Sequence, residues 1–171
     1  QNGLYGYLDA SGKEVIPANY SSAENFSNGK AIVKVKDNKH QLINHSGKVL
    51  QTYPYPYVGN LSDGLLAFSK SDWFDENRTM GYLNEKGEVV IEPKFKYADE
   101  FKEGRAIVRM ANGILQNSEE GLINTKGEWI LKPLFNDIKL LGQGRVAVGK
   151  AINQGNPIAG SIYTLATSDG K

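Results

Sequence analysis

Residues 81–95 read GYLNEKGEVVIEPKF, and residues 101–108 read FKEGRAIV. In the first segment, Asn84 can accept hydrogen bonds from backbone amides two residues further on. Gly87 can adopt the positive φ that ends a type I turn with a bulge. The flanking residues are rich in β-formers, as at 89–91. The segment therefore predicts a β-hairpin.

The same turn recurs, and a second glycine follows each turn glycine after 17 residues in all four copies. The paired glycines are Gly12 and Gly29, Gly47 and Gly64, Gly87 and Gly104, and Gly127 and Gly144. A constant interval in four copies is typical of a repeat protein. We expect one domain, residues 1–171, with repeats at 4–40, 41–79, 80–119 and 120–160 and a partial fifth at 161–171.

A further strand is expected behind each second glycine, as at 106–108, which gives three antiparallel strands per repeat. The residues between the hairpin and this strand carry apolar side chains three apart, which predicts a short helical turn at 97–101. A proline leads into that segment at Pro17, Pro93 and Pro133 and is expected to stop sheet pairing. An aromatic residue at one point of every copy predicts an aromatic ladder between stacked repeats: Tyr20, Tyr55, Phe95 and Phe135.

Two all-β architectures accommodate these repeats. An open array of stacked three-stranded units fits the variable repeat length. A closed small β-propeller fits the period of about 40 residues, but its blades usually have four strands and about 40–45 residues. The first interval of 35 residues, from Gly12 to Gly47, is short for a blade and favours the open array.

The pattern of residues 81–95 and 101–108 resembles the bacterial WG repeats, also called KWG repeats, over nearly the whole chain. The resemblance implies a bacterial, frequently surface-associated protein, and it brings no catalytic residue with it. The Trp-Gly pair that names the family is replaced in every copy, so Trp is not required for the fold. The pairs here are Tyr5-Gly6, His40-Gln41, Met80-Gly81 and Glu120-Gly121.

Composition excludes several classes of protein. The net charge is +1 and the basic residues are scattered, which is unlike a nucleic-acid-binding surface or an anionic membrane-binding surface. The absence of cysteine excludes disulfides and thiolate metal sites. No apolar run approaches the ~20 residues of a membrane span. We expect a monomeric fragment of a larger protein, at the cell surface or otherwise outside the cytoplasm, with a cytoplasmic location as the alternative.

The first candidate site is the segment from Ser69 to Met80. Trp73 and Phe74 have no counterpart in the other copies, and Arg78 and several carboxylates flank them. Such a segment suits stacking on a sugar ring or gripping a protein partner. The alternative is that Trp73 folds back and caps its own loop. The carboxylates lack the spacing of a calcium loop, so no metal site is predicted.

The second candidate is the run from Tyr53 to Tyr57, where alternating prolines enforce an extended backbone. Tyr55 occupies the repeated aromatic position, so Tyr53 and Tyr57 are the additional aromatics. They are expected to form a carbohydrate-binding strip or to pack against the next repeat. The inserts at 111–120 and 150–161 are the remaining segments that the repeat does not need, and the latter reads as a flexible loop.

The sequence offers little for an enzyme. His40 and His45 are the only histidines and lie on one short hairpin, and Ser46 is a turn residue, so no triad is indicated. No cofactor is predicted. The leading hypothesis is a non-enzymatic binding or scaffold module for a protein or a cell-wall glycan. The alternatives are a structural spacer and, third, an enzyme. A binding role predicts that Tyr53, Tyr57, Trp73 and Phe74 converge on one exposed face.

Overall fold

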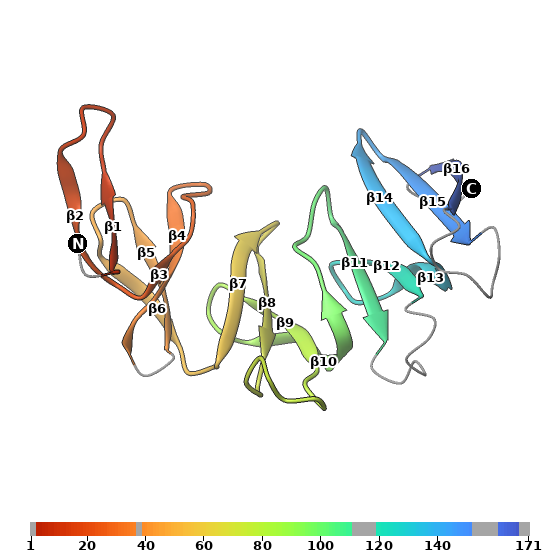
Figure 1. Cartoon of the computed structure of the whole chain (residues 1–171), viewed down its shortest axis with the longest axis horizontal. Coiled ribbons are helices and arrows are strands. Elements are labelled where there is room, and N and C mark those ends of the chain that lie inside the picture. Colours follow the sequence, from red (N-terminus) through yellow and green to blue (C-terminus); the bar gives the residue numbers. More distant parts are fainter. Residues whose placement is uncertain (1–2, 37–38, 111–118, 152–160, 168–171) are drawn as a thin grey trace. The chain divides into compact units, whose positions relative to one another are not determined.

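The chain is all-β in a computed structural model, which describes residues 3–36, 39–110, 119–151 and 161–167 (Figure 1). It groups into two compact units, Gln1–Pro93 and Lys94–Lys171. The strands of the first unit are β1 (Tyr5–Leu8), β2 (Glu14–Tyr20), β3 (Ser22–Ala23), β4 (Lys30–Lys34), β5 (His40–Asn44), β6 (Val49–Tyr53), β7 (Tyr57–Ser62), β8 (Leu65–Ser69) and β9 (Met80–Asn84). β10 (Val89–Ala98) belongs to both units, and the second unit holds β11 (Arg105–Met110), β12 (Glu120–Asn124), β13 (Trp129–Phe135), β14 (Asp137–Gly142), β15 (Arg145–Ala151) and β16 (Ser161–Thr167).

The strands form four sheets, and within each sheet neighbouring strands follow one another in the chain. They are β1–β2, β3 to β6, β7 to β13, and β14 to β16. Each sheet is open, with two edge strands, so none of those formed by the described residues closes on itself. The expectation of an all-β chain of antiparallel tandem repeats is confirmed. The inserts at 111–118 and 152–160 and the last residues of the partial fifth repeat lie outside the described part.

Two kinds of turn recur. In the first, the side chain of Asp9, Asn44, Asn84 or Asn124 accepts hydrogen bonds of 2.9–3.0 Å from the amides two and four residues further on. The turn glycine has positive φ, +82° at Gly87, as the sequence predicted. In the second, a residue with φ near +50° precedes the second glycine, as at Glu103-Gly104. Two successive positive φ angles define a type I′ hairpin turn.

The predicted helical turn at 97–101 is wrong, because Tyr97 and Ala98 lie in β10 and residues 99–101 form no helical turn. β10 continues to Ala98, and the Asp99 amide donates to the Ile107 carbonyl. The register advances two residues from Phe95 to Tyr97 but one from Met110 to Arg109, so β10 carries a β-bulge. In a regular strand every second side chain faces the same side. The extra residue of the bulge makes this interval three, so Phe95 and Ala98 both face the buried side. The apolar spacing of three therefore reflects a bulge.

The glycine of the Trp-Gly position lies beneath a facing strand. A Cβ on Gly81 would lie 2.3 Å from the Ile91 carbonyl oxygen, and one on Gly6 would lie 2.4 Å from that of Ile16. The facing strands bulge here: Glu120 pairs with Phe135, but Leu122 pairs with Leu131. The prolines lie within β2, β10 and β13 at these bulges, so they do not end the strands as expected.

The second repeat differs at this point, because it has Gln41 where the other copies have glycine. Here β5 and β6 pair without a bulge at the glycine position, with His40 opposite Tyr53, Gln41 opposite Thr52 and Leu42 opposite Gln51, and the register shifts only after Leu42, next to the turn. A regular ladder leaves room for a side chain. Glycine is therefore needed only where the facing strand bulges.

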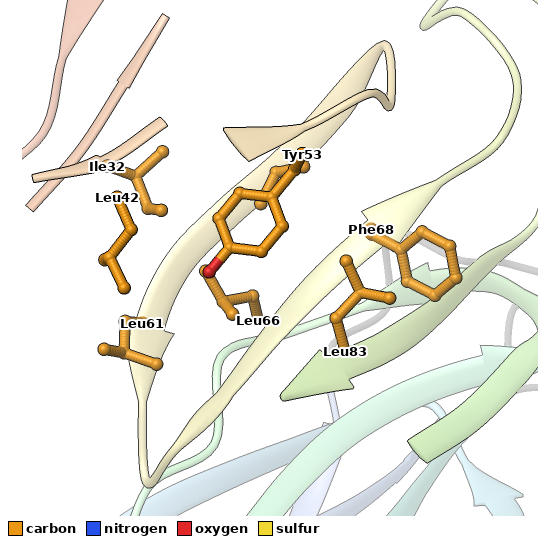
Figure 2. Close-up of a cluster of buried hydrophobic side chains, with 8 residues drawn as sticks. Ile32, Leu42, Tyr53, Leu61, Leu66, Phe68 and Leu83 are labelled. Atoms are coloured by element: carbon orange, nitrogen blue, oxygen red, sulfur yellow. The ribbon is translucent and has the colours of Figure 1, made fainter. Parts of the chain in front are cut away.

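Successive sheets pack through small apolar clusters. Figure 2 shows one in the first unit, to which β4 to β9 contribute. Its buried residues are Ile32, Leu42, Tyr53, Val58, Leu61, Leu66, Phe68 and Leu83. A repeated aromatic, Tyr55, packs against it through Phe68 at 4.8 Å between ring centroids. Separate clusters lie around Ile16 in the first unit and around Leu122 in the second.

Candidate binding site

The loop at 70–79 joins β8 to β9 through two successive turns. The Asp75 amide donates to the Asp72 carbonyl, and the Arg78 amide donates to the Asp75 carbonyl. The Asp75 carboxylate also accepts a hydrogen bond of 2.9 Å from the Asn77 amide. Short polar side chains favour such turns because they bind nearby backbone amides. This loop returns the chain to β9 and places Arg78 two residues before the strand.

Three of the predicted site residues come together: the Trp73 and Tyr57 rings lie beside the Arg78 guanidinium. Its central carbon lies 3.8 Å from the centroid of the Trp73 ring and 5.8 Å from that of the Tyr57 ring. The two rings are themselves 5.8 Å apart, with an interplanar angle of 47°. Tyr57 begins β7, so β7 and the 70–79 loop build this cluster jointly. The arrangement is a cation–π stack.

The aromatic groups beside this stack are exposed. Trp73 keeps 58% of its surface accessible, and its neighbour Phe74 keeps 93%. Trp73 does contact Arg78 of its own loop, as the alternative interpretation requires, but it also remains more than half exposed. Tyr57, Trp73 and Phe74 are called the aromatic surface below.

Tyr53 does not join this surface. Its side chain is fully buried in the cluster of Figure 2, and its hydroxyl donates to the Glu85 carbonyl at 2.7 Å. Burial raises the pKa of the Tyr53 phenol. Tyr53 of β6 pairs with buried His40 of β5, and both side chains lie on the inner side of the sheet. The expectation that Tyr53 is available to a ligand is therefore corrected, because in this structure it is a core residue.

Arg78 is 8% exposed, which is unusual for an arginine outside an ion pair. Among the described residues, its Nη1 has no hydrogen-bond partner, and no carboxylate forms a salt bridge with it. The two aromatic rings are its observed side-chain contacts. The sequence identified Arg78 as a flanking residue but gave no sign that it is buried.

The Trp position of the family motif has a structural role in three of the four copies. His40, Met80 and Glu120 are buried there, whereas Tyr5 of the first copy is exposed. His40 Nδ1 lies 3.1 Å from the Tyr55 carbonyl oxygen, and a Glu120 carboxylate oxygen accepts from the Ile138 amide at 2.6 Å. Burial lowers the pKa of His40. The position therefore connects β5 and β12 to the segments that follow them, which the sequence did not indicate.

Two further properties concern the described residues as a whole. None of these residues forms a helix with the length and apolarity needed to cross a lipid bilayer. The same residues contain no group of three or more His, Asp or Glu side chains arranged to hold a metal ion.

The family model described as "WG containing repeat" matches residues 5–39, 80–113 and 121–150. These matches omit the second repeat, whose β5–β6 ladder lacks the bulge and the glycine. No curated protein matches the chain. A solved structure titled "Crystal structure of the eukaryotic initiation factor" superposes with a TM-score of 0.56 at 16% identity. That match covers 95% of this chain but 46% of the other, so the chain spans less than half of that protein. At this identity the likeness shows the fold alone.

Proposed function

The chain belongs to the family of WG-containing repeats, and on that premise we propose that it is a non-enzymatic binding module of a larger bacterial protein. The module presents its aromatic surface, Tyr57, Trp73 and Phe74, to a glycan of the cell wall. Its place is at the cell surface or otherwise outside the cytoplasm. The observation that carries this proposal is the contact of an exposed Trp73 with Tyr57, with the exposed Phe74 next to Trp73 in a loop that the repeat does not need.

The geometry of Trp73 suits a sugar. One side of the indole packs on the Arg78 guanidinium, while more than half of the side chain remains accessible. Sugar hydroxyls are hydrogen-bond donors, and Asp72 brings an acceptor carboxylate next to Trp73 in the chain. The pairing of a ring with nearby acceptors is what a glycan requires.

A structural spacer is the second candidate, and the burial of Tyr53 favours it. Tyr53 ties the second repeat to the third through its bond to the Glu85 carbonyl, and Glu85 also pairs with Lys30 of the first repeat. These contacts serve cohesion between repeats and have no need of a ligand. A spacer, however, gives no reason for Phe74 to be almost entirely exposed.

Co-sedimentation with purified bacterial sacculi tests the proposal. The wild-type chain is expected to pellet with the sacculi, and Trp73→Ala is expected to remain in the supernatant. Tyr5→Ala is the matched control, because Tyr5 is an aromatic of similar exposure in β1, away from the 70–79 loop. Pelleting of all three proteins to the same extent would remove the aromatic surface from the binding site. If none pellets, the cell-wall glycan is excluded and the spacer becomes the leading candidate.

A further inference from the structure

Arg78 is a buried cation that forms no salt bridge with a carboxylate of the described residues. Burial takes a guanidinium out of water at a cost that is normally offset by an ion pair and by hydrogen bonds to its N–H groups. Arg78 Nη1 is buried and unpartnered within the described part of the chain. Its contacts with Trp73 and Tyr57 are cation–π interactions, which are weaker than a buried bidentate carboxylate pair.

Three other part-buried or buried cations among the described residues pair with carboxylates, although Arg105, like Arg78, leaves its Nη1 without a hydrogen-bond partner. Arg105 bonds to Glu103 at 2.6 Å, Arg109 bonds to Glu120 at 2.6 Å, and Lys30 pairs with Glu85. The fold therefore supplies a carboxylate to these cations and supplies two aromatic rings to Arg78. A guanidinium presents a planar fork of donors that matches a carboxylate in bidentate geometry. The anion that Arg78 lacks is the group that a ligand can bring.

The cover over Arg78 belongs to a surface loop. Trp73 lies over the guanidinium but is more than half exposed, and the 70–79 loop lies outside the strands. A change of side-chain rotamer at Trp73 can uncover the guanidinium without disturbing β8 or β9. Asp72, Asp75 and Glu76 also lie in this loop, and their negative charge disfavours a densely anionic polymer.

We propose that Arg78 binds the carboxylate of an acidic sugar, in a glycan whose neutral sugars contact the aromatic surface. The inference rests on the proposed function, because it assumes that the aromatic surface receives a glycan. On binding, the ligand carboxylate takes the place of the Trp73 ring beside the guanidinium, and the ring stacks on the sugar. The ligand carries isolated acid groups among neutral sugars.

Fluorescence titration of the full chain tests this proposal. Trp129→Phe leaves Trp73 as the sole tryptophan, and Phe can retain the edge contact that Trp129 makes with Phe95. The probes are trisaccharides with one glucuronate, one galacturonate or one N-acetylmuramate, each compared with its neutral methyl ester. At least one acid is expected to bind about tenfold more tightly than its ester, with a change in Trp73 emission. Arg78→Gln is expected to abolish that preference, and Arg78→Lys to retain part of it, because lysine keeps the charge but not the fork.

The outcomes separate this inference from the proposed function. Equal binding of every acid and its ester would overturn the role of Arg78. If Trp73→Ala then bound neither the acid nor the ester, the glycan-binding role of the aromatic surface would still hold. An acid preference that survives in Arg78→Gln would also overturn it. If no trisaccharide binds and the chain does not pellet with sacculi, both proposals fall.

Discussion

The turn at 102–105 and the loop at 70–79 each bury one arginine and treat it differently. Arg105 is 4% exposed and bonds to Glu103 at 2.6 Å. The same carboxylate accepts hydrogen bonds from the Gln143 amide at 2.9 Å and the Gly144 amide at 3.1 Å, so it connects the third repeat to the turn of the fourth. The Arg78 guanidinium lies against the Trp73 and Tyr57 rings, and it forms no salt bridge with a carboxylate of the described residues. The 102–105 turn holds two neighbouring repeats together, whereas the 70–79 loop presents aromatic groups at the surface.

The largest difference between the two regions is expected in the free energy of unfolding, when one phenylalanine in each is replaced with alanine. Phe101 precedes the 102–105 turn and is 1% exposed, whereas Phe74 in the loop is almost fully exposed. Phe101→Ala is expected to lower the free energy of unfolding by about 3–5 kcal/mol and to unfold much of the protein. Phe74→Ala is expected to change it by less than about 0.5 kcal/mol. Thermal melts followed by circular dichroism check both, and a wild-type Tm for Phe101→Ala would contradict the assignment of the first region.

A smaller effect is expected from replacing each arginine with methionine. Arg105→Met removes the partner of Glu103, and because that carboxylate is about half exposed, we expect a loss of stability smaller than that of Phe101→Ala. Arg78→Met removes a buried cation without an ion pair and retains apolar volume, so its stability is expected to equal or exceed that of the wild type. Urea denaturation measures both. A marked destabilisation by Arg78→Met would show that the loop arginine is structural, like Arg105.

The smallest effect is a pH dependence confined to the first region. The backbone amides of Gly144 and Gln143, followed by Arg105, hold the pKa of Glu103 below its usual value. A depressed folded-state pKa contributes stability above the unfolded-state pKa of about 4.3, and this contribution is lost as the pH falls through the folded-state pKa. Glu103→Gln should therefore be less stable than the wild type at pH 7, and the gap should close below about pH 4. Tm values at pH 7, 5 and 3 test this, and a gap of constant size would contradict it.

The periodic features of the fold could be predicted from sequence because local chemistry dictates them. The Asx side chains and positive-φ glycines of the first turn act within five residues, so Asn84 and Gly87 indicate the hairpin directly. The bulge in β10 could not be predicted, because apolar residues three apart are equally compatible with a helical turn. Only the pairing of Phe95 with Met110 and Tyr97 with Arg109 distinguishes the two.

The candidate site could be predicted in part. Trp73, Phe74, Tyr57 and Arg78 were identified because the repeat has no need of them, and the structure brings Tyr57, Trp73 and Arg78 together. The inward orientation of Tyr53 depends on which strand it pairs with, and the burial of Arg78 depends on the contact between β7 and the loop. Both are tertiary properties that no local pattern encodes.

The glycine beneath the bulge has a consequence for the ancestry of such chains. A copy without the bulge at that site, such as the second, does not require glycine there, and Gln41 is acceptable. Mutations can then accumulate in that copy while its neighbours keep their signature. Repeats of common origin would thus diverge in sequence at unequal rates, and the most divergent repeat need not be the one that arose first.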